Sequence, residues 1–377
     1  MYDVAVVGAG PAGSAAALSA RRAGASVLLL DKAAFPRDKS CGDGIAPHSL
    51  DELVTLGAGH VLDDRVQVHR LSLRSPSGSW ARTRLQRPDH VVPRELLDAR
   101  LVACAVDAGA ELLQHTVRTV VDRGDHVVLD GELAARVVIG ADGANGVVRR
   151  ALGVPRQEPG AMAVAVRGYA PSPGGEPEQV IAMDGRDWPS YAWRFDAGDG
   201  TSNVGFGMLL PSLRANPSGK QVLHERMVEL LPETAGAVKM RSHHLPLSTS
   251  RPVQPRGRVL LVGDAASLVN PLTGEGIFYA LLSGRLAGAA WDAVDPGASY
   301  GAALARELGR HLRHTTLLAR LTADRRVLEA GVRAADRSTG AMDALVEVGL
   351  GRGLVTAPLV RAIGAEAVRS IRRRLPI

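Results

Sequence analysis

The chain has 377 residues, of which 46% are apolar and 22% charged, and its formal net charge is +6. This composition is typical of a folded globular protein and excludes a disordered chain. Because the charges are interspersed and no basic stripe with interleaved aromatic residues occurs, nucleic-acid binding is not expected. The two cysteines suit a reducing compartment, and no apolar run reaches the ~18 residues of a membrane span. We therefore expect a soluble, cytoplasmic protein without a signal peptide.

The N-terminal segment has the pattern of a βαβ unit. Residues 3–7 predict a short apolar strand, and an alanine-rich helix is expected over residues 13–23. The run ASVLLLDK, residues 25–32, then predicts a buried parallel strand. About thirty residues are enough for such a parallel crossover.

The turn between this strand and helix reads GAGPAG, residues 8–13. Gly8 permits the tight turn, Gly10 lets the backbone approach a pyrophosphate, and Gly13 allows close packing of helix on strand. The helix would offer free N–H groups and the positive end of its dipole to the phosphates. Asp31, at the end of the second strand, is placed to accept hydrogen bonds from a ribose. Together these features predict a dinucleotide-binding site.

Further along the chain the hydrophobic pattern alternates between strand and helix. Residues 66–92 predict an antiparallel sheet insertion, and residues 93–110 a strong amphipathic helix with a proline near its first turn. Strands are expected at residues 111–121, 126–129 and 136–140, the last followed by a glycine-bearing turn.

From about residue 162 to 247 the sequence pattern changes to β-like stretches that are separated by Pro/Gly-rich turns. This predicts a second region built on one antiparallel sheet. The chain then returns to strand, loop and helix, and the tail from about residue 300 is expected to be helical.

A second motif, RVLLVGDAASLVNPLTGEGI at residues 258–277, favours FAD over NAD. Its buried strand places Asp264 at the carboxyl end, where an acid can hold the ribityl hydroxyls of a flavin. Gly274 and Gly276 follow, and a helix opens at Ile277 with its amides toward the flavin pyrimidine edge. The alternative is an ordinary strand–helix junction with Asp264 as N-cap.

Several blocks together resemble a known family. The glycine turn with Asp31, GADG at 140–143 and GDA at 263–265 match the signatures of flavoprotein monooxygenase-like enzymes of the p-hydroxybenzoate hydroxylase type. Within that group the chain resembles the geranylgeranyl reductase family up to about residue 290. The blocks that carry this resemblance are FPRDKSCGDG (35–44), VPRELLD (92–98), YAWRFDAGDGTSNVGFG (191–207) and NPLTGEGIFYAL (270–281).

The resemblance implies an α/β fold, with a Rossmann-like FAD-binding domain, an antiparallel β-sheet substrate domain and a helical C-terminus. The FAD-binding domain is then discontinuous. The expected boundaries are 1–65, 92–160 and 250–300 for the FAD-binding domain, 66–91 and 161–249 for the β-rich domain, and 301–377 for the helical region.

The resemblance also implies the residues that hold FAD. Arg94 would pair with the pyrophosphate or the ribityl chain. Val117 would lie on a strand whose backbone meets the adenine, and Asp142 would bridge the flavin and pyridine-nucleotide regions, although Gly146 stands where relatives often have serine. The full expected set is Gly8, Gly10, Ala12, Gly13, Asp31, Lys32, Cys41, Gly42, Gly44, Arg94, Val117, Asp142, Asp264, Gly274, Gly276 and Ile277.

Cys41 and Asp43 are the catalytic candidates, because the loop that carries them is expected beside the flavin ring. Cys41 can position an alkene or assist proton delivery as a thiol, or it can simply fill space as a small apolar residue. Asp43 either interacts with the flavin or shapes the turn. No strong acid in the sequence is visibly dedicated to protonating a substrate.

Tyr191, Trp193 and Phe195 alternate along one strand and should share one face. The family interpretation is a cavity wall that binds an apolar substrate, and the alternative is ordinary sheet packing. His243 and His244 have no metal-ligating partner at usable spacing, so no metal site is expected.

The preferred function is therefore an FAD-dependent oxidoreductase that reduces double bonds of a hydrophobic prenyl or lipid substrate by hydride transfer. The first alternative is a flavin monooxygenase that hydroxylates or epoxidises its substrate, and the second is a non-catalytic electron-transfer module. Because no second GxGxxG occurs, the reductant is expected to be transiently bound NAD(P)H or an external electron-donor protein. The basic-apolar end RSIRRRLPI is either a solvated helix terminus or a peripheral contact with anionic lipid.

Overall fold

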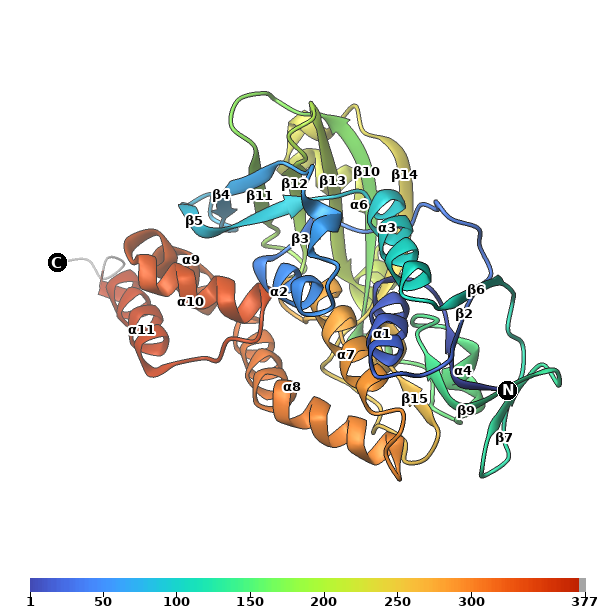
Figure 1. The fold of residues 1–377 in the computed structure, drawn as a ribbon. Coiled ribbons are helices and arrows are strands. Elements are labelled where there is room, and N and C mark those ends of the chain that lie inside the picture. Colours follow the sequence, from blue (N-terminus) through green and yellow to red (C-terminus); the bar gives the residue numbers. More distant parts are fainter. Residues whose placement is uncertain (373–377) are drawn as a thin grey trace.

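The computed structural model describes residues 1–372 of the chain. Within this range, an eight-stranded sheet forms the upper part of the view in Figure 1 and a seven-stranded sheet its lower right. This arrangement confirms the predicted α/β class with a helical C-terminal region. Residues 373–377, the last part of the basic-apolar end, lie outside the described residues.

The seven-stranded sheet is built on apolar strands that are buried at its centre. β1 (Tyr2–Val7) pairs in parallel with β2 (Val27–Asp31) and with β9 (Leu133–Gly140), and every residue of β2 is buried. The strand order is β6-β2-β1-β9-β8-β7, with β15 beside β9. The remaining strands are β6 (Glu111–Gln114), β7 (Val120–Asp122), β8 (Val127–Leu129) and β15 (Val259–Leu261).

The predicted strand over 111–121 is wrong in its middle. Residues 115–119 form an irregular segment between β6 and β7, and Val117 lies there rather than on a strand. The cause is Asp130, whose Oδ1 accepts hydrogen bonds from the backbone amides of Arg118 at 2.9 Å and Thr119 at 2.7 Å. These amides are thereby withdrawn from a strand ladder.

The eight-stranded sheet has the order β14-β10-β13-β12-β11-β4-β5-β3. The insertion predicted at 66–92 is confirmed as the antiparallel pair β4 and β5. One pairing departs from the expected antiparallel sheet, because β11 runs parallel to β4, a strand that enters from a much earlier part of the chain. The strands are β3 (Gly44–Ile45), β4 (Gln67–Arg74), β5 (Trp80–Val91), β10 (Met162–Pro171), β11 (Glu178–Met183), β12 (Tyr191–Asp196), β13 (Thr201–Leu209) and β14 (Val238–Pro246).

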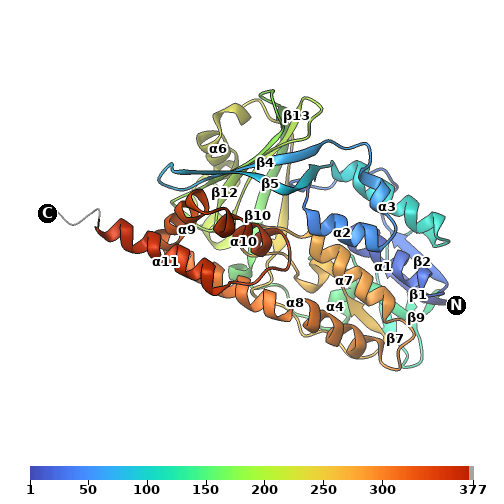
Figure 2. The ribbon, with the colours of Figure 1, turned by 60° about the vertical axis from the view of Figure 1, so that its left-hand side comes forward.

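The helices join the two sheets and extend beyond them (Figure 2). Of the four C-terminal helices, α8 (Pro296–Leu321) runs along the bottom of Figure 1 against α7, and the last three form a group at its lower left, where α9 packs against β5. The helices are α1 (Pro11–Arg22), α2 (Pro47–Thr55), α3 (Arg94–Asp107), α4 (Val147–Ala151), α5 (Leu210–Ala215), α6 (Gln221–Leu230), α7 (Ile277–Ala289), α8 (Pro296–Leu321), α9 (Arg325–Arg337), α10 (Thr339–Leu350) and α11 (Ala357–Arg372).

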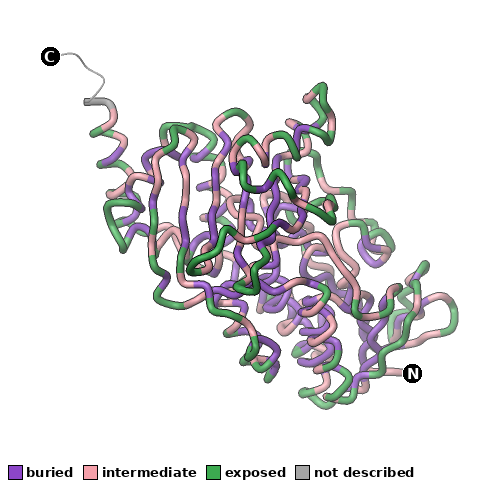
Figure 3. Tube along the Cα trace, turned by 90° about the horizontal axis from the view of Figure 1, so that it is seen from above, coloured by how far each residue is buried: buried purple, intermediate pink, exposed green. Residues whose placement is uncertain are grey.

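The buried residues concentrate in the middle of the sheets and in the helices packed on them, whereas the peripheral loops are exposed (Figure 3). No helix in residues 1–372 combines the length and apolar character that crossing a bilayer requires.

Helices α1 and α7 approach so closely that their backbones touch. A Cβ atom added to Gly284 would lie 2.2 Å from the carbonyl oxygen of Ala12, and one added to Gly288 would lie 2.3 Å from that of Ala16. Only glycine fits at these two positions of α7. The contact joins segments that are more than 260 residues apart, so it positions the glycine turn before α1 beside the loop before α7.

We expect Gly288→Ala to destabilise the protein by about 1–3 kcal/mol, because the added methyl group forces the two helices apart. The control is Gly364→Ala on α11, where an added Cβ meets no heavy atom within 4 Å. That change should be neutral or stabilising by up to ~1 kcal/mol through helix propensity. Thermal unfolding of both variants checks this, and equal melting temperatures would contradict the close approach.

Candidate active site

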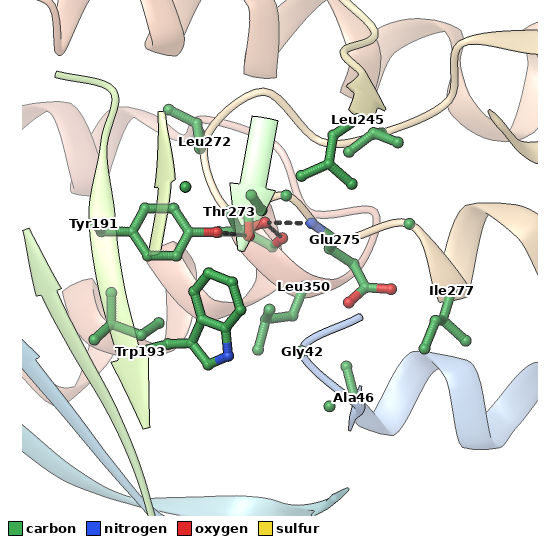
Figure 4. Close-up of a pocket in the computed structure, with 18 of the residues that line it drawn as sticks. Gly42, Ala46, Tyr191, Trp193, Leu245, Leu272, Thr273, Glu275, Ile277 and Leu350 are labelled. Atoms are coloured by element: carbon green, nitrogen blue, oxygen red, sulfur yellow. Dashed lines mark hydrogen bonds between the residues drawn. The ribbon is translucent and has the colours of Figure 1, made fainter. Parts of the chain in front are cut away.

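A cavity of about 330 Å³ lies where the carboxyl ends of β1 and β15 meet the eight-stranded sheet and the C-terminal helices. Its lining includes the start of α1, the Cys41–Gly44 loop, one face of β12, and the loop before α7. Figure 4 shows the aromatic side of this cavity, with Tyr191 and Trp193 facing the loop that carries Thr273 and Glu275.

The glycine turn has the backbone shape predicted for a pyrophosphate cradle. Gly8 has φ +100°, and a Cβ atom at Gly13 would lie 1.8 Å from the carbonyl oxygen of Gly8. Gly10, Pro11 and Ala12 line the cavity, and no side chain caps the N-terminus of α1 at Gly10. The first amides of this helix are thus directed to the cavity, as anion binding requires.

Two arginines complete this anion-binding end. A Cβ atom on Gly10 would lie 3.7 Å from a guanidinium nitrogen of Arg37 and 3.7 Å from one of Arg94. The helix terminus and the two guanidinium groups therefore converge on one point. This donor set fits the pyrophosphate of a dinucleotide cofactor. Arg94 was predicted for this role, whereas Arg37 was missed although it lies within the FPRDKSCGDG block.

Arg94 is held by a buried ion pair. Its Nε and Nη2 donate to the two carboxylate oxygens of Asp98 at 2.6 and 2.8 Å, and Arg37 lies 3.2 Å from the same carboxylate. Arg94 is 4% exposed and Asp98 is fully buried. Burial opposes the charge of Arg94, but the carboxylate of Asp98 outweighs it and raises the pKa of Arg94. The arginine is thus permanently charged and fixed in direction.

Asp31 joins the end of β2 to the glycine turn. Its Oδ2 accepts a hydrogen bond from the amide of Ala9 at 2.9 Å, its Oδ1 accepts one from Ala33 at 2.9 Å, and Arg37 lies 3.5 Å from Oδ2. The neighbouring Lys32 is exposed and does not line the cavity.

Five other expected cofactor residues also do not line the cavity, namely Gly8, Gly13, Asp31, Val117 and Asp142. Val117 is buried in the core of the seven-stranded sheet. Asp142 accepts a hydrogen bond from the amide of Val148 at 3.0 Å and so caps α4, while its neighbours Ala141 and Gly143 line the cavity. Gly146 stands where relatives often have serine, and the structure explains the glycine. A Cβ atom at this position would lie 2.0 Å from Oδ1 of Asp142.

The second predicted motif reaches the cavity as a unit. Asp264, Gly274, Gly276 and Ile277 all line it, and Asp264 lies 3.6 Å from Nζ of Lys39. The start of α7 differs from the expectation, because Oε1 of Glu275 accepts a hydrogen bond from the amide of Phe278 at 2.7 Å. One of the amides expected to face a flavin is therefore already satisfied by the protein.

The Cys41–Gly44 loop is anchored to the eight-stranded sheet through Asp43. Oδ2 of Asp43 accepts hydrogen bonds from the hydroxyl of Tyr169 at 2.6 Å and from Nδ2 of Asn203 at 2.7 Å. Asn203 also donates to the carbonyl oxygen of Cys41 at 2.9 Å. Asp43 itself has φ +61°, a left-handed conformation that an isolated aspartate rarely adopts. Burial raises its pKa to about 6, against the opposing effect of these hydrogen bonds.

Cys41 stands in the cavity wall beside Arg94. Burial raises the pKa of the Cys41 thiol, and the nearby charge of Arg94 only partly opposes this. The side chain is therefore a neutral thiol near pH 7. A neutral thiol can contact an alkene or donate a weak hydrogen bond, but it is a poor nucleophile.

The three aromatic residues of β12 share one face, as their alternation predicted, and all three line the cavity. The ring centroids are 6.1 Å apart for Tyr191 and Trp193, and 6.4 Å apart for Trp193 and Phe195. Tyr191 donates its hydroxyl to the carbonyl oxygen of Thr273, and Nε1 of Trp193 donates to Asn203 at 2.8 Å. Their polar atoms are thus satisfied, which leaves the ring faces as an apolar wall.

The far wall is formed by the C-terminal helices and is joined to the loop before α7. Nδ2 of Asn270 donates to the carbonyl oxygens of Val348 and Gly349 at 3.1 and 3.2 Å, and the Thr273 hydroxyl donates to that of Gly349 at 2.6 Å. These bonds attach the C-terminal helices to the loop before α7. Past the aromatic wall, the cavity continues into a largely apolar region. Its far lining includes Leu318, Leu328, Val332, Met342, Leu345 and Ile363.

Two carboxyl groups of this cavity were not predicted from the sequence: Asp89 on β5, which is buried, and Glu275 before α7, which is half-buried. Asp89 is 2% exposed, and within residues 1–372 its Oδ1 has no hydrogen-bond partner. Glu275 was visible in the second motif, but nothing in the sequence around Asp89 indicated that β5 would carry it to the cavity.

Comparison with known proteins agrees with this site. A family model described as "FAD binding domain" matches residues 1–181. A menaquinone reductase of Mycolicibacterium smegmatis is 38% identical over 308 residues, which cover 76% of this chain and 75% of that protein. Digeranylgeranylglycerophospholipid reductase 1 of Methanopyrus kandleri is 36% identical over 309 residues, covering 76% of this chain and 79% of that protein.

Among solved structures, a geranylgeranyl bacteriochlorophyll reductase-like protein of Thermoplasma acidophilum superposes with a TM-score of 0.79 at 21% identity, over 99% of both chains. The fold and the cradle thus define an FAD-dependent oxidoreductase. The identity to the two reductases is high enough to place the chain further, and it belongs to the geranylgeranyl reductase family.

We expect Arg94→Ala to weaken FAD binding at least tenfold and to lower stability by about 3–5 kcal/mol, because Asp98 loses its main partner while buried. The double variant R94A/D98A should recover much of the stability but not the affinity for FAD. Fluorescence titration with FAD and thermal unfolding measure the two effects. Arg100→Ala, on the same helix but paired with the more exposed Asp64, is the control and should leave FAD affinity unchanged.

Proposed function

We propose that the protein reduces carbon–carbon double bonds in a prenyl-type chain of a lipid or quinone, with electrons supplied by an external reductant through FAD. The observation that carries the proposal is the continuity of the cavity. One end is a cradle for a dinucleotide, and the other is an apolar chamber between the aromatic wall and the C-terminal helices. The relatives support the substrate class, because their names include a menaquinone reductase and a digeranylgeranylglycerophospholipid reductase.

Different residues of the site would hold different parts of FAD. The N-terminus of α1 with Arg37 and Arg94 would hold the pyrophosphate, Asp31 the ribose, and Asp264 the ribityl chain. When bound, FAD supplies the hydride for the double bond and takes up electrons from the reductant. We infer that the reductant is NAD(P)H bound transiently or an electron-donor protein, because the chain carries one GxGxxG turn.

The chain's own contribution is to orient the substrate and exclude water. The rings of Tyr191, Trp193 and Phe195 would hold the alkene segment against the Cys41–Gly44 loop. A Cβ atom at Gly42 would lie 3.4 Å from the Phe195 ring, so the loop backbone and the aromatic wall bound a narrow space. The neutral thiol of Cys41 would contribute contact rather than charge.

The direct test of this function is a reduction assay in the absence of oxygen. FAD-loaded protein is reduced with dithionite and mixed with geranylgeranyl and menaquinone-type compounds. We expect the flavin absorbance to return on mixing, and the product to be heavier by two hydrogen atoms. A product that forms only in air and gains one oxygen atom would identify an oxygenase instead. Absence of reoxidation with every prenyl compound would contradict the proposal.

The length of the chamber should set the length of chain that the enzyme accepts. Gly331 on α9 lines the cavity, and an added Cβ there meets no heavy atom within 4 Å. We expect Gly331→Leu to lower the rate with geranylgeranyl compounds at least tenfold, because its side chain fills the chamber, and to spare geranyl compounds. Gly364→Leu, equally unhindered but outside the cavity lining, is the matched control. Equal losses with both chain lengths would contradict this assignment.

A further inference from the structure

Reduction of an isolated double bond requires a proton as well as a hydride. We propose that Asp89 donates this proton to the substrate and that Glu275 is the positioning residue that keeps Asp89 protonated until it does so. The inference rests on the proposed function. It assigns a general acid that neither the sequence motifs nor the names of the relatives indicate.

The position of Asp89 suits an acid that acts on an apolar substrate. It lies on β5 and lines the cavity together with Leu71, Leu73 and Ile181, and the side-chain amide of Gln179 is its polar neighbour. Its carboxyl group is almost inaccessible to solvent, and its Oδ1 has no partner among residues 1–372. A buried carboxyl group with a free oxygen is stable in such surroundings as the neutral acid rather than as the anion. The unpartnered oxygen is therefore available to a ligand in the cavity.

Glu275 differs from Asp89 because part of its charge is compensated. Its Oε1 accepts a hydrogen bond from the amide of Phe278 at 2.7 Å, at the N-terminus of α7, where the helix dipole favours an anion. Burial raises the pKa of Glu275 to about 7, with the amides of Phe278 and Ile277 opposing. Burial raises the pKa of Asp89 to about 8, and the charge of Glu275 adds to this rise while the amide of Gln179 opposes it.

The two carboxyl groups are coupled, because a negative charge on Glu275 disfavours ionisation of Asp89. The helix amides favour the charge on Glu275 rather than on Asp89. The other titratable groups that face Glu275 are the phenols of Tyr191 and Tyr279, both neutral near pH 7. Within residues 1–372, no lysine or arginine contributes to the pKa shift of either carboxyl group. Only neutral amides therefore oppose the rise in pKa of the two carboxyl groups within this range.

Other candidate donors in the cavity are less suited. Asp43 also has an unpartnered Oδ1, but its Oδ2 accepts hydrogen bonds from Tyr169 and Asn203, which limit the rise of its pKa to about 6. The hydroxyl of Tyr191 is occupied by the carbonyl oxygen of Thr273. The thiol of Cys41 is a weak acid because burial raises its pKa. Asp89 differs from Asp43 because burial raises its pKa further, to about 8, and its Oδ1 has no partner among residues 1–372.

The O–H bond of Asp89 breaks, and its electron pair stays on the oxygen as carboxylate. The π electrons of the alkene form the new C–H bond at one carbon, and the hydride from the reduced cofactor completes the other. Asp89 regains a proton from water before the next substrate binds. Two hydrogen atoms are added to the alkene, and the cofactor is oxidised by two electrons.

The test compares D89N, D89E and E275Q with the wild type, each loaded with FAD and reduced with dithionite under anaerobic conditions. We expect D89N to bind FAD and to accept electrons normally, but to be reoxidised by a prenyl alkene about 10²–10⁴-fold more slowly, as loss of a general acid predicts. D89E should recover part of this rate. D196N is the control, because Asp196 is a buried carboxyl group of the same sheet outside the cavity lining.

The pH dependence isolates the role of Glu275. The wild-type rate of reoxidation should fall as the pH rises through about 8, since the donor must be protonated. In E275Q the missing charge lowers the pKa of Asp89, so this fall should move to lower pH. An independent readout is infrared spectroscopy of the oxidised protein at pH 7. The wild type should show protonated-carboxyl absorption that shifts in D2O. D89N should lose the Asp89 component of this absorption, whereas E275Q should lose only the Glu275 component.

The outcomes separate this inference from the proposed function. If the wild type reduces no prenyl alkene, the proposed function fails. If the wild type is active and D89N reduces the alkene at the same rate, Asp89 is not the donor. If D89N does not fold, an unchanged pH profile in E275Q together with full activity of D89E at high pH would overturn the inference equally well.

Discussion

The contact between the backbones of α1 and α7 is the constraint on which the site depends. Each helix begins at a glycine-rich turn, and each turn supplies one side of the dinucleotide cradle. Because Gly284 and Gly288 allow the helices to touch at Ala12 and Ala16, the two turns are held at one fixed separation. A larger residue at either glycine would displace the two halves of the cradle relative to each other. The FAD site is thus a product of helix packing as much as of its own motifs.

Around that cradle, the protein uses few charges and satisfies most of them internally. Arg94 is fixed by Asp98, and Asp43 is fixed by Tyr169 and Asn203, so both serve the shape of the site through buried pairs. The substrate side is different, since it is walled by aromatic rings and aliphatic side chains. Asp89 and Glu275 stand out there because burial raises the pKa of both carboxyl groups, and no lysine or arginine among residues 1–372 lowers it again.

Much of this could be predicted from local sequence. The glycine turn, Asp31, the strand before Asp264 and the shared face of Tyr191, Trp193 and Phe195 follow from short-range patterns whose geometry is repeated wherever they occur. What could not be predicted depends on contacts between distant segments. Val117 left its expected strand because Asp130 binds the amides beside it, and Asp142 caps α4 inside the space that Gly146 leaves. Asp89 could not be predicted, since its place in the cavity depends on where β5 lies in the fold.

The hydrogen bonds from Asn270 and Thr273 to the end of α10 have a consequence for how the enzyme can diverge. They attach the far wall of the chamber to the same loop that carries Gly274 and Glu275. A change in the C-terminal helices that widened the chamber would therefore also displace this loop. Adaptation to a bulkier lipid would require compensating substitutions at residues 270–276. The C-terminal helices and this loop must therefore evolve together.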